Sequence, residues 1–310
     1  MRIVYMGTPD IAVPTLRFLA ESKHEVVGVL TQPDRPKGRG HHTIPTPVKA
    51  AALEYDIPVY QPLSLRKGED AAAALETLRQ LAPDLIVVLA YGQLLPKEVL
   101  ELPKYGCINL HASLLPAYRG AAPIQWVILN GETKTGVTAQ QMAEGLDTGD
   151  MLVKKEIAIG AEETAEELYE RLSELCVETL SETLEQLEAG TLQGTPQDDA
   201  QSSYASRITK EMSALDFTRP AAELHNLIRG ITGFTMLEGK RLKVYGSRVV
   251  EGVSGEAGTI AEPEDFVVAC GDGNGLRFTE IQPEGKRRMA AADFLRGKKL
   301  KKGEKLGNAE

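Results

Sequence analysis

The sequence is poor in features that mark several classes of protein. It has only three cysteines, Cys107, Cys176 and Cys270, which are far apart and lack the spacing of a metal site. Such a set argues against a disulfide framework and is typical of a reducing cytoplasm. A membrane-spanning helix needs about 18 consecutive apolar residues, and no run in this sequence is that long. The amino-terminal MRIVYMGTPD also lacks the apolar segment of a signal peptide. We therefore expect a cytoplasmic protein without membrane contact.

Histidine is also scarce, and its placement excludes two kinds of chemistry. His24, His41, His42 and His225 show no ligand spacing with one another or with the cysteines, so no metal is expected. Ser113 follows a histidine closely but lacks the Gly-x-Ser-x-Gly setting of a hydrolase nucleophile. The chemistry must therefore proceed without a metal ion or a covalent nucleophile.

The first two thirds of the 310 residues alternate between strand-like and helix-like segments. The strands, such as RIVYMGT and DLIVVLAY, are β-branched and apolar on both faces. This alternation predicts a doubly wound α/β domain with a mostly parallel, Rossmann-like sheet. GTPD at Gly7–Asp10 has one glycine where a dinucleotide site has Gly-x-Gly-x-x-Gly, so we expect no such site.

A second, smaller domain is predicted after a long helix. The helix spans Thr164–Ala189: it begins with a capping box, Thr164-x-x-Glu167, continues with leucines at helical spacing, and stops at Gly190. Residues 190–206 are polar and rich in turn formers, which predicts a linker between a domain of residues 1–189 and one of residues 207–310. Short strand-like runs between glycine turns predict a small, OB-like β-barrel in the latter.

The charge is unevenly distributed along the chain. Residues 1–206 have 17 Lys and Arg against 29 Asp and Glu, whereas residues 207–310 have 18 against 15. Much of the positive charge lies in KRRMAAADFLRGKKLKKGEK, from Lys286 to Lys305. A basic end on an otherwise acidic chain is typical of proteins that bind a polyanion. A tail that only increases solubility explains the charge equally well.

The stretch NLHASLLPAYRGAAPIQW, from Asn109 to Trp126, is the strongest candidate for a site. Asn109 and His111 are two residues apart on a strand, so their side chains share a face. They stand at the carboxyl end of a predicted parallel strand, where open α/β sheets place their ligands. A core histidine bonded to its neighbour is the alternative; the position of the pair favours function.

A carboxylate is available in GLDTGDM, where either Asp147 or Asp150 can reach the same crevice or merely cap its own turn. Asparagine, histidine and aspartate suit direct attack of an amine or water on an acyl carbon. Asn109 and protonated His111 would bind the oxyanion, and the Asp–His pair would move protons. The residues therefore indicate acyl transfer.

These motifs, together with TQPDRPKGRG (Thr31–Gly40), resemble the methionyl-tRNA formyltransferase family within the folate-dependent formyltransferase superfamily. The resemblance covers nearly the whole chain. The Asn-x-His…Asp core is common to the superfamily, while the proline- and arginine-containing loop and the second domain narrow it to the tRNA enzymes. The resemblance implies transfer of a formyl group from 10-formyltetrahydrofolate to the α-amine of initiator methionyl-tRNA, for translation initiation.

The resemblance also implies roles for single residues. It makes Asn109, His111 and Asp147 the catalytic trio, and it selects Asp147 over Asp150. It places two segments against the folate, the second mainly through backbone groups: Ser113, Leu114, Leu115 and Pro116, and Tyr91, Gln93, Leu94 and Leu95.

The tRNA contacts are expected in two places. The prolines of the loop Thr31–Lys49 exclude a regular helix, and Arg35, Lys37 and Arg39 give it positive charge. The resemblance implies that this loop reaches the acceptor end of the tRNA, with Arg39 the most important residue. The basic tail is then expected to contact phosphates.

One segment departs from the family, and two other functions compete. Where the family usually has an Asn-Pro-Trp-Pro-like turn, the chain reads RGITGFTMLEGK, Arg229–Lys240, so contacts of the small domain are expected to differ. The alternatives are a formyltransferase for a sugar amine or glycinamide nucleotide, and an RNA-binding protein on a degenerate scaffold. The intact Asn109, His111 and Asp147 argue against the RNA-binding protein. We expect a monomer.

Overall fold

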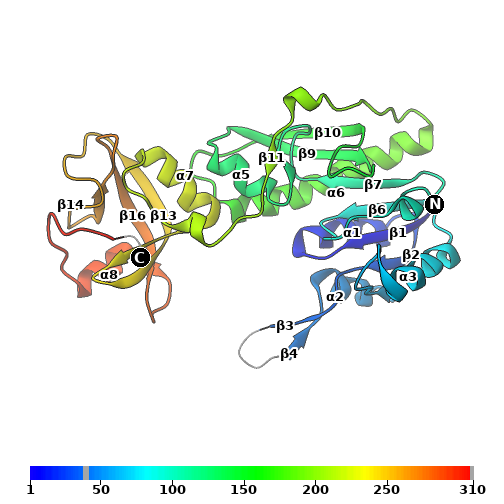
Figure 1. Ribbon diagram of the computed structural model, residues 1–310, viewed down its shortest axis with the longest axis horizontal. Helices are drawn as coiled ribbons and strands as arrows, with labels where there is room; N and C mark the ends of the chain where they lie inside the picture. The colour runs from blue at the N-terminus through cyan, green and yellow to red at the C-terminus, as the bar shows by residue number, and fades with distance from the viewer. Residues whose placement is uncertain (38–41, 308–310) are drawn as a thin grey trace. The chain divides into compact units, whose positions relative to one another are not determined.

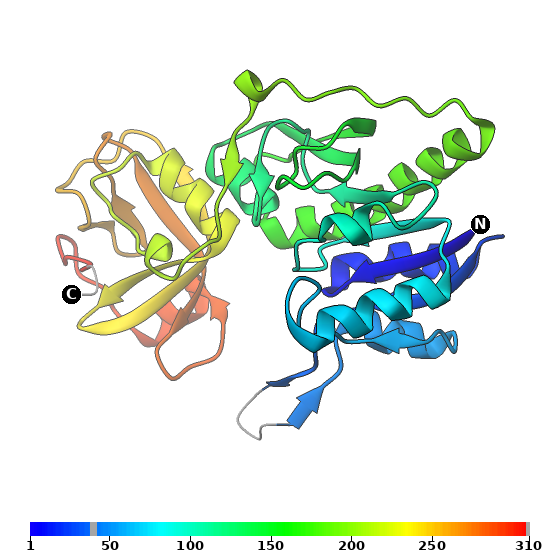
Figure 2. The same cartoon turned by 45° about the vertical axis from the view of Figure 1, so that its right-hand side comes forward.

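The computed structural model describes residues 1–37 and 42–307, and these divide into two compact units (Figures 1 and 2). The first unit comprises Met1–Pro123, Lys134–Ala158 and Leu168–Ala205. The second comprises Ile124–Thr133, Ile159–Glu167 and the described chain from Ser206 onward. Two short stretches that precede Ser206 in the chain thus belong to the second unit. The division of the sequence at residues 189 and 207 stays a prediction.

The first unit is built on a seven-stranded sheet in the order β10-β9-β7-β6-β1-β2-β5. The strands from β7 to β5 are parallel, whereas β9 and β10 run antiparallel at one edge. The bounds are β1 (Arg2–Gly7), β2 (Glu25–Leu30), β5 (Val59–Tyr60), β6 (Leu85–Leu89), β7 (Cys107–His111), β9 (Lys134–Gln141) and β10 (Met151–Ala158).

Helices cover both faces of this sheet. On one face, α3 and α4 pack against Val4, Met6, Ile86 and Val88. On the other, Tyr5 lies beside α1 and α6. The helices of the unit are α1 (Val13–Ala20), α2 (Pro47–Glu54), α3 (Gly68–Leu81), α4 (Lys97–Leu100) and α6 (Ala165–Ala189), with the 3₁₀ turns η1 (Asp10–Ala12) and η2 (Asp199–Gln201). The predicted doubly wound, mostly parallel α/β domain is confirmed.

Two small ribbons complete the unit. β3 (Arg35–Lys37) and β4 (His42–Ile44) pair as an antiparallel hairpin, which projects from the sheet in Figure 1. β8 (Arg119–Gly120) pairs in parallel with β11 (Tyr204–Ala205).

The long helix α6 begins as its sequence predicts. The backbone N–H and the hydroxyl of Thr164 both donate to Glu167 Oε2 at 2.8 Å, and the N–H of Glu167 donates back to Thr164 Oγ1. These bonds from Thr164 hold the pKa of Glu167 below its usual range. Gly190, with φ of 69°, follows the last turn. The capping box and the glycine stop are therefore both present.

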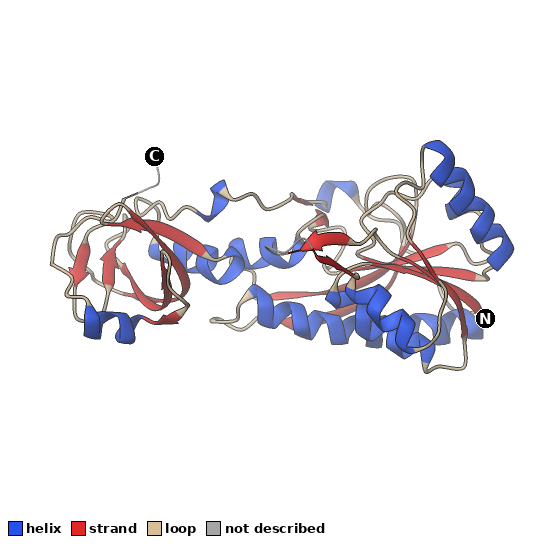
Figure 3. Cartoon of the chain, turned by 90° about the horizontal axis from the view of Figure 1, so that it is seen from below, coloured by secondary structure: helices blue, strands red, loops and turns tan. Residues whose placement is uncertain are grey.

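The second unit is a small antiparallel barrel. Its strands follow the order β12-β13-β16-β15-β14, with β17 beside β16, and they curve around a shared core in Figure 3. The bounds are β12 (Gly233–Leu237), β13 (Lys240–Val250), β14 (Ile260–Glu262), β15 (Val267–Ala269), β16 (Gly275–Pro283) and β17 (Met289–Ala290), with α5 (Pro123–Leu129), α7 (Ala221–Ile231), α8 (Ala291–Gly297) and η3 (Glu211–Ser213). The predicted barrel after the α/β domain is confirmed.

The basic tail closes this barrel. Gly307 exchanges two backbone hydrogen bonds with Met236 on the edge strand β12, at 2.9 and 3.0 Å. Gly303 and Glu304 bond Ile260 on the opposite edge strand β14, at 2.8 Å each. Leu306 of this segment is only 3% exposed and belongs to the core. The segment is thus a structural part of the barrel, whatever its exposed lysines bind.

The three cysteines are buried and unpaired. Burial raises the pKa of Cys107, Cys176 and Cys270 to about 12 in each case. Their thiols are accordingly unreactive at neutral pH and act as small core side chains.

Replacing Leu306 by alanine is expected to lower the free energy of unfolding of the second unit by about 2–4 kcal/mol, because it leaves a cavity where the tail closes the barrel. Lys302→Ala, an exposed change in the same segment, is the control and should stay within about 0.5 kcal/mol of the parent. Calorimetry of both variants measures the difference. Equal unfolding of the two variants would show that the tail does not support the barrel.

Candidate active site

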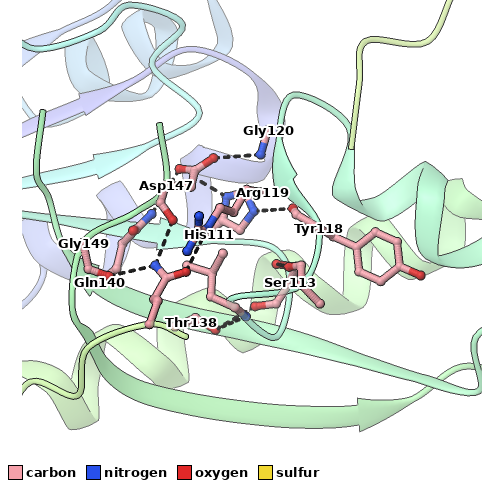
Figure 4. Close-up of polar contacts among 12 residues, drawn as sticks. His111, Ser113, Tyr118, Arg119, Gly120, Thr138, Gln140, Asp147 and Gly149 are labelled. Atoms are coloured by element: carbon pink, nitrogen blue, oxygen red, sulfur yellow. Dashed lines mark hydrogen bonds and ion pairs between the residues drawn. The ribbon is translucent and has the colours of Figure 1, made fainter. Parts of the chain in front are cut away.

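His111 is held at the carboxyl end of β7 by the loop that follows it. Its ring is 7% exposed, and Nε2 lies 2.8 Å from the carbonyl oxygen of Tyr118 (Figure 4). Because a carbonyl oxygen only accepts hydrogen bonds, Nε2 must be the protonated nitrogen. Tyr118 has φ of 59°, a left-handed conformation that turns the chain back toward the ring. Nδ1 therefore remains as the nitrogen that can serve a ligand.

Asp147 faces this remaining nitrogen. Its Oδ1 lies 3.7 Å from Nδ1 of His111 and accepts a hydrogen bond from Gln140 Nε2 at 3.0 Å. Its Oδ2 accepts the backbone N–H of Gly120 at 2.9 Å. The carboxylate is thus fixed by two donors beside an imidazole. Asp150, the alternative left open by spacing, is exposed and does not take this place.

Asn109 supplies an amide beside the imidazole. It lies two residues before His111 on β7 and pairs in register with Gln140 of β9, so the three side chains share a face of the sheet. Its side chain is half-buried, and it has no hydrogen-bond partner among residues 1–37 and 42–307. The Asn109 amide is thus available to a ligand.

The loop that carries Asp147 reaches the site by folding back. Because β9 is antiparallel to β7, the loop leaves the sheet beside Cys107, at the start of β7, where Met142 N–H bonds the Cys107 carbonyl at 2.8 Å. The reversal needs φ of 53° at Asp147. It also needs a glycine at position 149, because a Cβ there would lie 1.7 Å from the carbonyl oxygen of Gln141. The reversal therefore requires the glycine at position 149 and a left-handed residue at position 147.

The loop that carries Asp147 is also held by residues 190–206, the segment that the sequence predicted only as a linker. Gln197 Nε2 donates to the carbonyl oxygens of Asp147 and Gly149, at 2.8 Å each. Its Oε1 accepts Arg119 Nε at 3.0 Å, and Arg119 is also paired with Asp199 at 2.7 Å. Sequence analysis missed Gln197 and Gln140. Gln140 could have been predicted only from the strand register that pairs it with Asn109. No local sequence signal predicts the role of Gln197.

The segment expected to contact folate is anchored by its own side chains. Ser113 is fully buried and donates its hydroxyl to the Ala117 carbonyl at 2.6 Å. Leu115 is also fully buried, and its N–H donates to Thr138 Oγ1 at 3.1 Å. Leu114 and Pro116 are half-buried. Any ligand contact from this segment would therefore come from its backbone or from those two side chains.

The other segment predicted to contact folate, Tyr91–Leu95, also has side chains that bond or pack within the protein. The Gln93 side chain bonds the N–H of Leu65 at 2.9 Å and the carbonyl of Pro62 at 3.0 Å. Tyr91 is buried, which raises its pKa, while Leu95 is 6% and Leu94 48% exposed. Leu94 is thus the one predicted side chain here that is open to a ligand.

The predicted tRNA-binding loop is described only at its base. Asp34 and Lys49 pair at 2.5 Å, and this hydrogen bond holds the pKa of Asp34 below its usual range. Arg35 is exposed, Lys37 ends β3, and Arg39 lies outside the described residues. No contact between described residues links Arg35 to the Asn109, His111 and Asp147 group.

The sequence matches one family in both parts. Residues 1–184 match the Formyl transferase family, and residues 207–299 match the Formyl transferase C-terminal domain. The chain therefore belongs to the formyl transferase family. It is an enzyme of the transferase class, as the motifs predicted.

The similar relatives share one name. The methionyl-tRNA formyltransferase of Geobacter sulfurreducens is 51% identical over 316 residues, with 100% of this chain and 98% of the relative covered. That of Alkaliphilus oremlandii is 49% identical over 313 residues, with 99% and 100% covered. The resemblance drawn from the motifs is confirmed.

Solved structures show the same fold at lower identity. An N-formyltransferase from Helicobacter canadensis, in complex with folinic acid and dTDP-3-aminofucose, matches with a TM-score of 0.68 and 21% identity, covering 91% of this chain and 98% of the other. Within the described ranges, no helix is long and apolar enough to cross a membrane. The same residues hold no cluster of three His, Cys, Asp or Glu side chains suited to a metal ion.

Replacing Gln140 by glutamate is expected to slow formyl transfer by about ten- to a hundredfold, because it removes a charge-assisted hydrogen bond to Asp147 and sets two carboxylates together. Gln140→Leu removes only the donor and should cost less. Gln80→Glu, an exposed change on α3, is the control for charge. Steady-state kinetics should show a fall in kcat with little change in KM. An active Gln140→Glu enzyme would mean that Gln140 does not position Asp147.

Proposed function

We propose that this protein transfers the formyl group of 10-formyltetrahydrofolate to the α-amine of initiator methionyl-tRNA, for translation initiation. This proposal is supported above all by the open face that Asn109, His111 and Asp147 form at the end of β7. The full-length similarity to enzymes named for this reaction supports the same substrate.

The site has the groups needed for direct attack of the amine on the formyl carbon. The amine nitrogen forms a bond to this carbon, the formyl oxygen takes up negative charge, and the bond to N10 of the folate then breaks. Asn109, with its unoccupied amide, and the protonated ring of His111 stabilise the oxyanion. The Nδ1 side of the ring performs this role, because Nε2 is bound to the Tyr118 carbonyl.

Asp147 has two tasks in this scheme. Its negative charge lies 3.7 Å from Nδ1 and attracts the positive charge that the ring carries in the transition state. It also takes part in moving the proton that the attacking amine loses and the N10 leaving group gains. The donors Gly120 and Gln140 keep the carboxylate in place while the charge develops.

The folate is expected along two segments near this face. The backbone from Ser113 to Pro116, with the Leu114 and Pro116 side chains, forms one wall of its site, and Tyr91–Leu95 forms the other. Their inward hydrogen bonds keep the walls rigid before the ligand arrives, which lowers the entropic cost of binding. No metal ion takes part in this scheme.

The tRNA is expected to meet the β3–β4 hairpin. Arg35, Lys37 and Arg39 give this loop positive charge, and the Asp34–Lys49 pair anchors its base. Arg35 at the base of the loop is exposed, and exposed cations suit contact with phosphates of the acceptor end. A sugar amine or glycinamide nucleotide, the alternative substrate, would need no such loop.

Replacing His111 by alanine, or Asp147 by asparagine, is expected to lower the rate of formylation at least about a hundredfold, because each change removes a group that stabilises the transition state. Affinity for methionyl-tRNA should change little. Single-turnover formylation and a tRNA-binding assay on the same samples measure the two quantities. Variants with the parent's rate would refute the mechanism.

Replacing Arg39 by alanine is expected to raise the KM for methionyl-tRNA or to lower turnover, because one phosphate contact is lost, while folate affinity stays unchanged. Arg66→Ala, at an exposed arginine of the first unit, is the control for loss of a positive charge. Steady-state kinetics in which methionyl-tRNA and folate are varied in turn distinguish an effect on tRNA binding from an effect on folate binding. Weaker folate binding in the Arg39 variant alone would contradict the assignment of the loop.

A further inference from the structure

Residues 195–205, which we call the strap, are bonded to both loops of the candidate site. At one end, Thr195 exchanges two backbone hydrogen bonds with Met151 at the start of β10, at 2.8 Å each. At the other end, β11 pairs in parallel with β8 in the loop that follows β7. The strap therefore belongs to the first unit and is more than a tether between two domains.

One end of the strap holds the loop that fixes His111. The hydroxyl of Ser203 accepts the N–H of Tyr118 at 2.8 Å, and its carbonyl accepts the next N–H along the chain at 2.9 Å. In Figure 4 the carbonyl of Tyr118 bonds the ring of His111, and the N–H of Gly120 bonds the carboxylate of Asp147. The strap thus supports the backbone that positions both catalytic groups.

The strap reaches the Asp147 loop through one side chain, Gln197, which is half-buried between exposed neighbours. Its Nε2 donates to the carbonyls of Asp147 and Gly149 at 2.8 Å each, so both amide hydrogens are used. Its Oε1 accepts Arg119 Nε at 3.0 Å, and Arg119 is paired with Asp199 at 2.7 Å. Three bonds therefore fix the orientation of the Gln197 amide.

The Asp147 loop is mostly exposed. Residues 143–146 are open to solvent, and Asp147 itself has φ of 53°, a region that residues with a Cβ seldom adopt. A segment with little buried apolar surface opens at a low cost in free energy. The position of the loop therefore depends on hydrogen bonds. Gln140 and Gly120 hold the carboxylate of Asp147, and Gln197 holds its backbone.

We propose that Gln197 is a positioning residue for formyl transfer that acts through Asp147. It fixes the backbone that carries the carboxylate, and a displacement of about 1 Å in such a group costs up to about a hundredfold in rate. Gln197 supports Asp147 from behind, so its effect is on turnover and not on substrate binding. This assignment rests on the proposed function. It makes the segment between the two domains a determinant of rate.

The first test compares Gln197→Met with Gln201→Met. Methionine keeps the length of glutamine but has no amide, and Gln201 is an exposed glutamine of the same strap whose side chain donates to Asp198 at 2.9 Å. Gln197→Met should lower kcat about tenfold and leave the KM for methionyl-tRNA and for folate within about twofold of the parent. Gln201→Met should match the parent. A parental kcat in Gln197→Met would overturn the proposal.

A double-mutant cycle tests whether Gln197 acts through Asp147. Asp147→Asn removes the carboxylate charge but keeps the backbone carbonyl that Gln197 bonds. In that background, Gln197→Met should lower the single-turnover rate less than about twofold, because the two changes remove one effect. A residue that only supports the fold would cost the same factor in both backgrounds, and this result would refute positioning.

Gln197→Asn keeps the amide on a side chain that is one methylene shorter and cannot reach both carbonyls. Its kcat should lie between those of the parent and of Gln197→Met. The same cycle can be run with this variant if Gln197→Met does not fold. A kcat no higher than that of a folded Gln197→Met would show that the amide is not the group that matters.

Amide hydrogen exchange tests the arrangement without any substrate. The N–H of Gly120 bonds Asp147 Oδ2 at 2.9 Å, so it reports whether the carboxylate stays in place. Its exchange should be at least about tenfold faster in Gln197→Met than in Gln201→Met. Equal exchange would contradict the proposal. A parent that does not formylate methionyl-tRNA would instead refute the proposed function, whereas an active parent with equal exchange in both variants refutes only the role of Gln197.

Discussion

The site depends on one arrangement, the Asp147 carboxylate held 3.7 Å from Nδ1 of a buried histidine. A carboxylate so placed is useful only if it cannot swing away, and Gly120 and Gln140 prevent this by donating to its two oxygens. The imidazole is fixed from its other side by the Tyr118 carbonyl. The geometry leaves one ring nitrogen and the neighbouring Asn109 amide facing the position where the proposed mechanism needs donors for the oxyanion.

Several elements of the first unit hold Asp147 and His111 in this arrangement. The antiparallel β9 places Gln140 opposite Asn109 and sends the next loop away from the site, so that the loop must fold back. Gln197, about fifty residues later in the chain, holds the returning loop, and Arg119 in turn donates to the Gln197 side chain. The charged and polar groups are therefore positioned mainly by backbone atoms and amides, which do not change protonation during the reaction.

The sequence predicted the elements whose signals are local. The alternation of strands and helices, the Thr164 capping box and the Asn109–His111 strand end are each readable within a few residues. Two features are not local. The direction of β9 cannot be read from GVTAQQM, because parallel and antiparallel strands buried on both faces share this pattern. Gln197 lies in a polar stretch whose composition indicates a loop, and only tertiary contacts give it a partner. The basic tail likewise looked like a solvated end, yet its Leu306 closes the barrel.

The proposed reaction is the formylation of an amine carried by tRNA. The most direct measurement incubates the full chain with 10-formyltetrahydrofolate and with initiator methionyl-tRNA, elongator methionyl-tRNA or an amino sugar nucleotide, and scores the loss of the free amine. We expect a blocked amine on initiator methionyl-tRNA and none on the amino sugar. A free amine on the tRNA, together with formylation of the sugar, would contradict the proposed reaction.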